Sequence, residues 1–274
     1  MIPFAKAHAC GNDFLIVTEE AAQGCDADEL TRRLCARNTG IGADGIEFFA
    51  WTGPKSGRIH LHNADGSIAE ISGNGTRCVA AWMARERGYA TGDQLSIATD
   101  AGPRVCNIDK ISADGEFAVE LTAGMGIPEF ALRRVTLASG SEIRGVSVSA
   151  GNPHFVIVAD NSEFAVAGRS WQSIGAEICG HGDFPQRTNV EFARIATPAR
   201  IEIRIFERGV GPTTSSGTGS SAAATAAIAL GLAKSPLTVV APGGAQTVSW
   251  EGPGTELKLT GPASLIATGE AFFV

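Results

Sequence analysis

The chain has 274 residues, of which 44% are hydrophobic and 19% charged, a composition typical of a soluble globular protein long enough for two domains. Its net charge of −7 argues against a groove for nucleic acid, and no uncharged run reaches the ~20 apolar residues that cross a membrane. Lys6, His8 and Asp13 stand where a signal peptide needs its apolar core. We therefore expect a cytoplasmic protein with no nucleic-acid or membrane partner.

The first half of the chain predicts a sheet interrupted by two helices. The helix predicted over 28–35 has its acids first and its arginines later, as the helix dipole prefers. A second helix over 75–87 ends at Gly88. Glycine and aspartate turns separate the strands that we predict at 14–17, 46–49, 58–62, 95–99, 104–108 and 117–121.

The second half repeats this plan after a linker at 122–128, which holds two glycines and a proline. Its helices are predicted around 170–179 and, rich in alanine, over 218–232. Strands are predicted at 147–149, 155–159, 201–206, 238–240, 246–250 and 256–260. We expect the tail 263–274 to return to the first domain, which gives one domain of 1–121 plus 263–274 and another of 122–262.

Two glycine-rich turns precede the two inner helices of this plan. Ser72-Gly73-Asn74-Gly75 opens the first helix, and Ser216-Gly217-Thr218-Gly219 opens the alanine-rich one. Glycine lets the backbone approach a ligand closely, and the free N–H groups and positive end of a helix attract an anion. Each turn therefore predicts a small anion site.

The two turns belong to a longer internal repeat. Ser72 and Ser216 are 144 residues apart, and the same offset relates Gly45-Ile46-Glu47-Phe48 to Asn189-Val190-Glu191-Phe192. Asn63 and Glu207 each stand nine residues before the serine. A repeat this long indicates two duplicated domains, since solenoid periods run roughly 20–50 residues. Domains that face each other would bring both turns to one cleft, with a small anion between the two serine hydroxyls.

The pattern of cysteines, histidines and lysines does not favour a metal site or a cofactor. None of the six cysteines forms a C-x-x-C pair or a zinc spacing, which predicts free, buried thiols. His60 and His62 share a strand face, but without a third ligand nearby a structural role is favoured over a metal site. We expect no cofactor, because no lysine in a phosphate or pyridoxal context occurs.

Motifs over nearly the whole chain resemble those of one family. They are His8-Ala9-Cys10-Gly11-Asn12-Asp13-Phe14, Asn63-Ala64-Asp65-Gly66-Ser67, Gly73-Asn74-Gly75-Thr76-Arg77-Cys78, Gly151-Asn152-Pro153-His154, Arg187-Thr188-Asn189, Glu207-Arg208-Gly209-Val210-Gly211 and Gly217-Thr218-Gly219. Together they resemble the diaminopimelate epimerase family, pyridoxal-independent isomerases in the fold group of proline racemase. The resemblance implies an α+β fold of two duplicated domains, each a mostly antiparallel, barrel-like sheet around a central helix. The active site is then expected in the interdomain cleft.

The resemblance also implies a reaction and a binding site. The reaction is cofactor-independent α-proton transfer between LL- and meso-diaminopimelate, for lysine and peptidoglycan precursor synthesis. The residues expected to grip the distal amino acid end are Asn63, Asn152, Asn189, Glu207 and Arg208. The carboxylate at the reacting carbon would be held by Asn12 and the backbone amides of Gly73, Asn74, Gly217 and Thr218.

The chain departs from the family at the reacting groups. Ser72 and Ser216 stand at the positions of the family's two catalytic cysteines. A thiol has a pKa near 8.5 that a helix N-terminus can lower, whereas a serine hydroxyl needs a neighbouring base. His154 and Glu207 are the candidate helpers. Gly45 and Pro212 also replace a usual glutamine and a frequent glutamate.

Three readings therefore stay open. The chain is an epimerase with its substrate site retained, whether its serines are native or replace cysteines. It is alternatively a relative that catalyses another reaction of a small acid, such as a cis–trans isomerisation or an elimination, or a non-catalytic amino-acid-binding protein. The expected partner is a small amino acid with a distal carboxylate, and a homodimer stays open.

Overall fold

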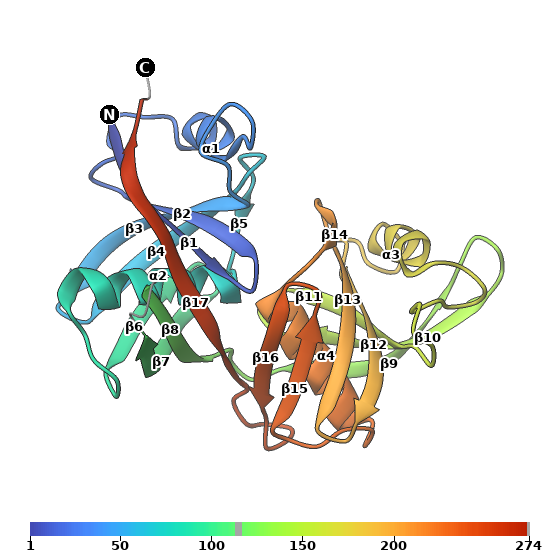
Figure 1. The fold of residues 1–274 in the computed structure, drawn as a ribbon. Coiled ribbons are helices and arrows are strands. Elements are labelled where there is room, and N and C mark those ends of the chain that lie inside the picture. Colours follow the sequence, from blue (N-terminus) through green and yellow to red (C-terminus); the bar gives the residue numbers. More distant parts are fainter. Residues whose placement is uncertain (113–116, 273–274) are drawn as a thin grey trace. The chain divides into compact units, whose positions relative to one another are not determined.

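The computed structural model describes residues 1–112 and 117–272 and divides the chain into two compact units. The first unit holds Met1–Gly124 and Thr260–Val274, and the second holds Met125–Leu259 (Figure 1). None of the helices in the described ranges is long and apolar enough to cross a membrane.

In the first unit the strands close into a barrel. Its strands are β1 (Ile2–Ala9), β2 (Asn12–Thr18), β3 (Gly45–Gly53), β4 (Ser56–Asn63), β5 (Ile68–Ala69), β6 (Gln94–Thr99), β7 (Gly102–Ser112), β8 (Phe117–Gly124) and most of β17 (Lys258–Ala271). Pairing runs from β1 through β2, β3, β4, β6 and β7 to β8, with the short β5 beside β4. The barrel closes because β17 pairs with both β1 and β8.

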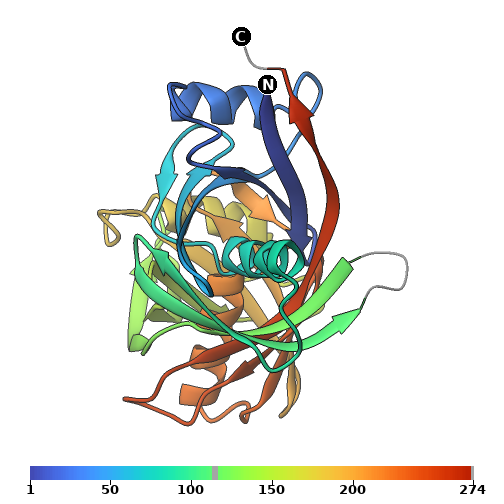
Figure 2. The ribbon, with the colours of Figure 1, turned by 90° about the vertical axis from the view of Figure 1, so that its left-hand side faces the viewer.

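One helix lies inside this barrel and another outside it. Figure 2 shows α2 (Gly73–Arg87) within the ring of strands, and its residues are buried from Gly73 to Ala84. A helix that is buried on all sides along most of its length needs such enclosure. The outer helix α1 (Ala27–Cys35) buries only one face, with Leu30 and Leu34 among its buried residues.

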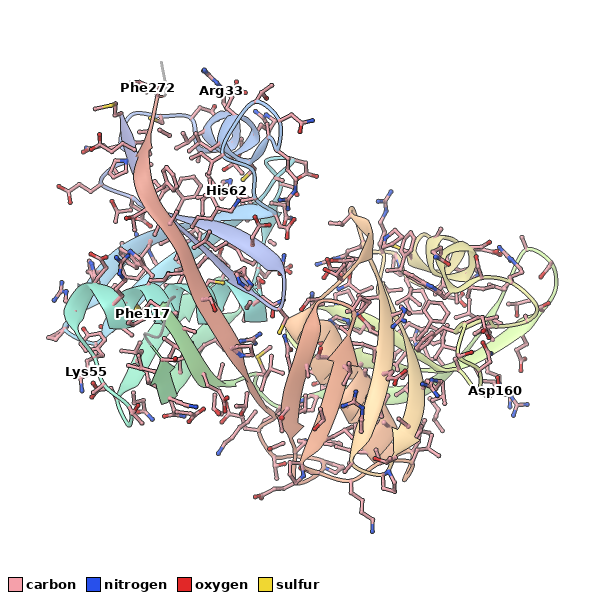
Figure 3. The ribbon with its side chains drawn as sticks, in the orientation of Figure 1. Arg33, Lys55, His62, Phe117, Asp160 and Phe272 are labelled. Atoms are coloured by element: carbon pink, nitrogen blue, oxygen red, sulfur yellow. The ribbon has the colours of Figure 1, made fainter. Side chains whose placement is uncertain are left out.

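Strand β2 is buried on both faces, which explains its unbroken apolar run. Phe14 and Ile16 pack toward α2, while Leu15 and Val17 pack in the cluster under α1. The side chains that fill the space between helices and strands are drawn in Figure 3.

The second unit repeats the arrangement. Its strands are β9 (Glu129–Thr136), β10 (Glu142–Ser149), β11 (Pro153–Val158), β12 (Asn189–Thr197), β13 (Arg200–Glu207), β14 (Gly211–Thr213), β15 (Leu237–Ala241) and β16 (Gly244–Ser249). The alanine-rich helix α4 (Gly217–Ala229) is buried against β10–β13, β15 and β16, and α3 (Trp171–Cys179) covers an outer cluster.

Strand registers confirm the duplication residue by residue. Parallel pairing places Phe14 opposite Gly45 in the first unit and His154 opposite Asn189 in the second. Antiparallel pairing then places Ile46 opposite His62, and Val190 opposite Phe206. The β4–β6 and β13–β15 pairs are both parallel. The predicted α+β fold of two duplicated, barrel-like domains around central helices is thus confirmed.

Several predicted boundaries were wrong. The strands β1 and β9 were not predicted, and the alanine-rich helix ends at Ala229 rather than at 232. The predicted strand at 256–260 and the predicted tail from 263 onward both overlap one continuous strand, β17 (Lys258–Ala271), and residues 273–274 of the tail lie outside the described residues.

Candidate active-site turns

The turn before α2 is organised by the Ser72 hydroxyl. Ser72 is the N-cap of the helix, and its Oγ accepts a hydrogen bond from the backbone N–H of Gly75 at 3.0 Å. The Thr76 hydroxyl donates to the Ser72 carbonyl at 2.8 Å. The first turn of the helix carries no acidic side chain, so no charge of its own offsets the positive end of the helix dipole.

The turn before α4 has the same construction. Ser216 is the N-cap, and its Oγ accepts from the Gly219 N–H at 3.1 Å. The Thr218 hydroxyl lies 3.4 Å from the same Oγ. Here too the first turn lacks acidic residues, and the helix residues from Gly217 to Ala227 are buried. Each unit thus presents a serine hydroxyl at the start of its central helix.

A buried glutamate lies behind each turn, a feature that sequence reasoning missed. A Cβ atom added to Gly75 would stand 1.9 Å from Glu47 Oε1, and one added to Gly219 would stand 2.8 Å from Glu191 Oε1. The second glycine of each turn therefore makes room for a buried carboxyl group. This is a second reason for glycine there, besides the close approach of a ligand to the backbone. One sequence feature could have revealed them: the two repeat-related segments, 45–48 and 189–192, each carry a glutamate between apolar residues.

The two glutamates differ in their surroundings. Both are 0% exposed, but neither oxygen of Glu47 has a hydrogen-bond partner within residues 1–112 and 117–272. Burial, and to a lesser degree the charge of Asp100, raises the pKa of Glu47 to about 8. Glu191 instead pairs with His154, whose Nδ1 lies 2.8 Å from Oε1. Burial raises the pKa of Glu191, and His154 opposes that shift.

Two of the predicted asparagines meet beside the first turn. Asn74 donates to Asn12 Oδ1 at 3.1 Å, and Asn12 donates to Asp44 at 2.6 Å. The buried Arg77 donates to Asn74 Oδ1 at 2.6 Å, and burial lowers the pKa of this guanidinium. Asn63 is the last residue of β4 and donates to Ser67 Oγ at 3.0 Å, so this hydrogen bond is separate from the ones above.

In the second unit the predicted residues form two groups. His154 Nε2 lies 2.7 Å from Asn152 Oδ1, so His154 joins Asn152 to Glu191. Asn189 Oδ1 accepts from the backbone N–H of Arg208 at 2.9 Å. Arg208 also donates to the Gln186 carbonyl at 3.3 Å, and Glu207 is the half-buried last residue of β13.

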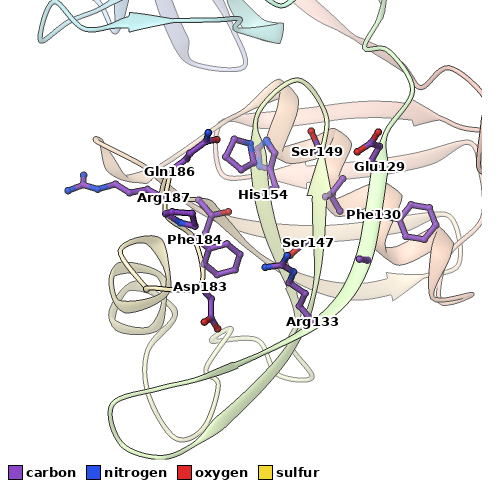
Figure 4. Close-up of a pocket in the computed structure, with 15 residues that line it drawn as sticks. Glu129, Phe130, Arg133, Ser147, Ser149, His154, Asp183, Phe184, Gln186 and Arg187 are labelled. Atoms are coloured by element: carbon purple, nitrogen blue, oxygen red, sulfur yellow. The ribbon is translucent and has the colours of Figure 1, made fainter.

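A cavity of about 400 Å³ opens beside His154 in the second unit. Figure 4 shows that its lining comes from β9, β10, β11 and the segment before β12. Charged side chains of both signs line it, including Arg133 and Asp183. The cavity could hold a small polar molecule, with the backbone from Asp183 to Thr188 along one side.

Comparisons with known proteins agree with this arrangement. The profile described as diaminopimelate epimerase matches residues 4–126 and 146–266. A diaminopimelate epimerase of Halothermothrix orenii is 36% identical over 289 residues, with 98% of this chain and 97% of that protein covered. One of Corynebacterium glutamicum is 36% identical over 278 residues, with 98% of both chains covered.

Solved structures show the same fold at low sequence identity. A probable proline racemase of Agrobacterium radiobacter superposes with a TM-score of 0.74 at 14% identity, covering 100% of this chain and 94% of that one. A predicted epimerase of Pseudomonas aeruginosa gives 0.73 at 13% identity, with both chains covered fully. The match of the family profile to both halves, with the two full-length relatives, shows that this chain belongs to the diaminopimelate epimerase family of isomerases.

Proposed function

We propose that the protein interconverts LL- and meso-diaminopimelate by cofactor-independent transfer of the α-proton. The observation that carries the proposal is the pair of equivalent turns, each with a serine hydroxyl at the start of a buried central helix. Ser72 and Ser216 would face opposite sides of the α-carbon. The site would lie in the cleft between the domains 1–121 plus 263–274 and 122–262.

The substrate's two ends would be held by different groups. At the start of any helix the first N–H groups point away from the helix and can bind an anion. The α-carboxylate would therefore meet the amides of Gly73, Asn74, Gly217 and Thr218 together with Asn12. The distal end would be gripped by Asn63, Asn152, Asn189, Glu207 and Arg208. The link from Asn189 to the Arg208 backbone supports a shared role for these two residues.

The biological setting follows from the family. We place the reaction in the cytoplasmic synthesis of lysine and peptidoglycan precursors, with His154 and Glu207 assisting proton transfer. The proposed reaction calls for no cofactor and no metal, because the α-carboxylate and the helix termini stabilise the charge that develops at the α-carbon.

The test measures binding and proton exchange separately. Calorimetry with diaminopimelate gives affinity, and incubation in D₂O followed by NMR reports deuterium at the α-carbon. Arg208→Ala should weaken binding by about tenfold or more, since hydrogen bonds to charged groups contribute about 1.5–3 kcal/mol. Arg200→Ala, at the exposed first residue of β13, should leave affinity unchanged. No binding by the unaltered protein would refute the proposed substrate.

One observation favours a second candidate. Both reacting positions hold serine, whose hydroxyl is a far weaker acid than a thiol. A non-catalytic homologue that binds amino acids would bind diaminopimelate and incorporate no deuterium. A relative with other chemistry would release an eliminated or isomerised product, which the same NMR spectra would reveal.

A further inference from the structure

In each unit the serine side chain and a buried carboxyl group lie beside the same glycine. The Cβ position on Gly75 that touches Glu47 is also 3.2 Å from Ser72 Cβ. The Cβ position on Gly219 that touches Glu191 is 3.2 Å from Ser216 Oγ. In both units the carboxyl and the serine side chain therefore lie beside the same glycine, next to the place that a Cβ atom would take.

The duplication makes the two glutamates equivalent and their neighbours different. Phe14 on β2 has the register that His154 has on β11. The Glu191 carboxyl has the His154 imidazole as its hydrogen-bond partner, whereas the matching position in the first unit holds Phe14, whose side chain cannot form such a bond. Asp100 disfavours the charged form of Glu47, and Glu47 in turn contributes to the raised pKa of the Cys78 thiol on α2.

Two similar carboxyl groups in such different surroundings can take different roles in proton transfer. A carboxyl in an apolar pocket keeps its proton at neutral pH and can donate it, while one that is hydrogen-bonded to a polar partner can accept one. Since a serine hydroxyl needs a partner to gain or lose a proton, a buried acid beside one serine and a buried base beside the other would complete a two-sided transfer.

We propose that Glu47 is the proton donor behind Ser72, and that Glu191, paired with His154, is the proton acceptor behind Ser216. This assignment deepens the proposed function and rests on it. Because both glutamates act through the serines, they are positioning residues and do not touch the substrate.

The proposed step balances in protons and electron pairs. Ser216 Oγ takes the α-proton while its own hydroxyl proton passes to Glu191, and the C–H electron pair stays on the α-carbon. Ser72 delivers its hydroxyl proton to the opposite face, where that pair forms the new C–H bond, and takes the proton of Glu47. One proton has moved from Glu47 to Glu191. The reverse reaction or exchange with water restores the starting state.

The first arm of the test does not depend on activity. Infrared spectra of the intact protein at neutral pH should contain an absorption of a protonated carboxyl that Glu47→Gln removes. Glu191→Gln and the control Glu120→Gln, at an exposed glutamate of β8, should retain it. A Glu47→Gln spectrum that still contains every protonated-carboxyl absorption would overturn the assignment.

The second arm measures α-proton exchange against pH. Glu47→Gln and Glu191→Gln should each slow exchange by about 100-fold or more, as expected for removal of a general acid or base. Glu47→Gln should also abolish the fall in rate toward alkaline pH, while affinity for diaminopimelate stays within about threefold of the unaltered protein's. Unchanged rates and an unchanged pH profile would overturn the proposal.

The two failures can be told apart. Ligand binding with no exchange in the unaltered protein would refute the proposed epimerisation, whereas exchange that Glu47→Gln and Glu191→Gln leave unchanged would overturn only the donor and acceptor roles. Failure to bind the ligand would refute the proposed function, and the infrared arm would still decide whether Glu47 holds the proton.

Discussion

Glu47 carries a cost that depends on pH. Its carboxyl is fully buried without a hydrogen-bond partner among the described residues, and burial raises its pKa from 4.5 to about 8. Between these values the folded chain binds a proton that the unfolded chain has released, so stability falls as pH rises through this window. The cost is absent below pH 4.5, where the carboxyl is protonated in both states, and it is complete once the pH has passed about 8.

We expect Glu47→Gln to remove this part of the pH dependence. The free energy of unfolding of the unaltered protein, measured in urea across the window, should fall relative to that of the variant as pH rises. Glu120→Gln, which replaces an exposed carboxyl, serves as the control. Parallel curves for Glu47→Gln and the unaltered chain would show that Glu47 is already ionised.

Sequence reasoning found the residues at the turns and missed those behind them. Ser72 and Ser216 were predictable because repeat and helix-cap patterns are local. The role of Glu47 was not, since it depends on contact with Gly75, which lies on another element. His154 was predicted to assist a serine, a role that stays a prediction, and its hydrogen bond to Glu191 required the β11–β12 register.

At the scale of elements, the serines also hold their helices in place. We expect Ser72→Ala to lower stability by about 0.5–2 kcal/mol, because it removes the acceptor of the Gly75 N–H. Ser72→Gly should cost only a few tenths of a kcal/mol, since glycine suits an N-cap. Chemical denaturation compares the two, and equal losses would argue against a capping role.

The second glycine of the turn before α2, Gly75, allows a sharper prediction about stability. Gly75→Ala should cost about 1–3 kcal/mol, because its Cβ would meet Glu47 Oε1 at 1.9 Å. Gly180→Ala, where nothing lies within 4 Å, should be nearly neutral. In a double-mutant cycle, Glu47→Ala should recover part of the Gly75→Ala loss. Additive effects would mean that the two residues do not press on one another.

Local pattern predicted the helices better than the outlying strands. β1 buries Ala5, Ala7 and Ala9, and alanine is a weak indicator of a strand. β9 is exposed at every position except Val135, so it shows no alternation of apolar and polar residues. Both strands form because neighbouring strands offer hydrogen-bond partners, which a local window does not contain.

At the scale of the whole molecule, the first unit depends on the end of the chain. Without residues 260–274, β1 and β8 would lose their shared neighbour β17 and become open edges. We expect this truncation to abolish the cooperative unfolding of the first unit. A fragment of residues 125–259, which is contiguous, should still fold. Calorimetric transitions identical to those of the intact chain would contradict this view of barrel closure.

Because each unit supplies one reacting group, we expect that both serines must be replaced by cysteine to obtain thiol chemistry. A hydroxyl lacks the basicity of a thiolate, and each tenfold change in rate corresponds to about 1.36 kcal/mol of barrier. We therefore expect the chain with Ser72 and Ser216 to exchange the α-proton of diaminopimelate very slowly. Ser72→Cys with Ser216→Cys should raise the rate by about 100-fold or more.

Either replacement alone should do much less, because one group removes a proton from one face while the other delivers one to the opposite face. Affinity should change little in all four proteins, since the anion-binding turns are made of backbone N–H groups. Exchange into D₂O, measured on the unaltered chain, both single variants and the double variant, tests this. Fast exchange with both serines in place, or no gain with both cysteines, would show that the reacting groups lie elsewhere.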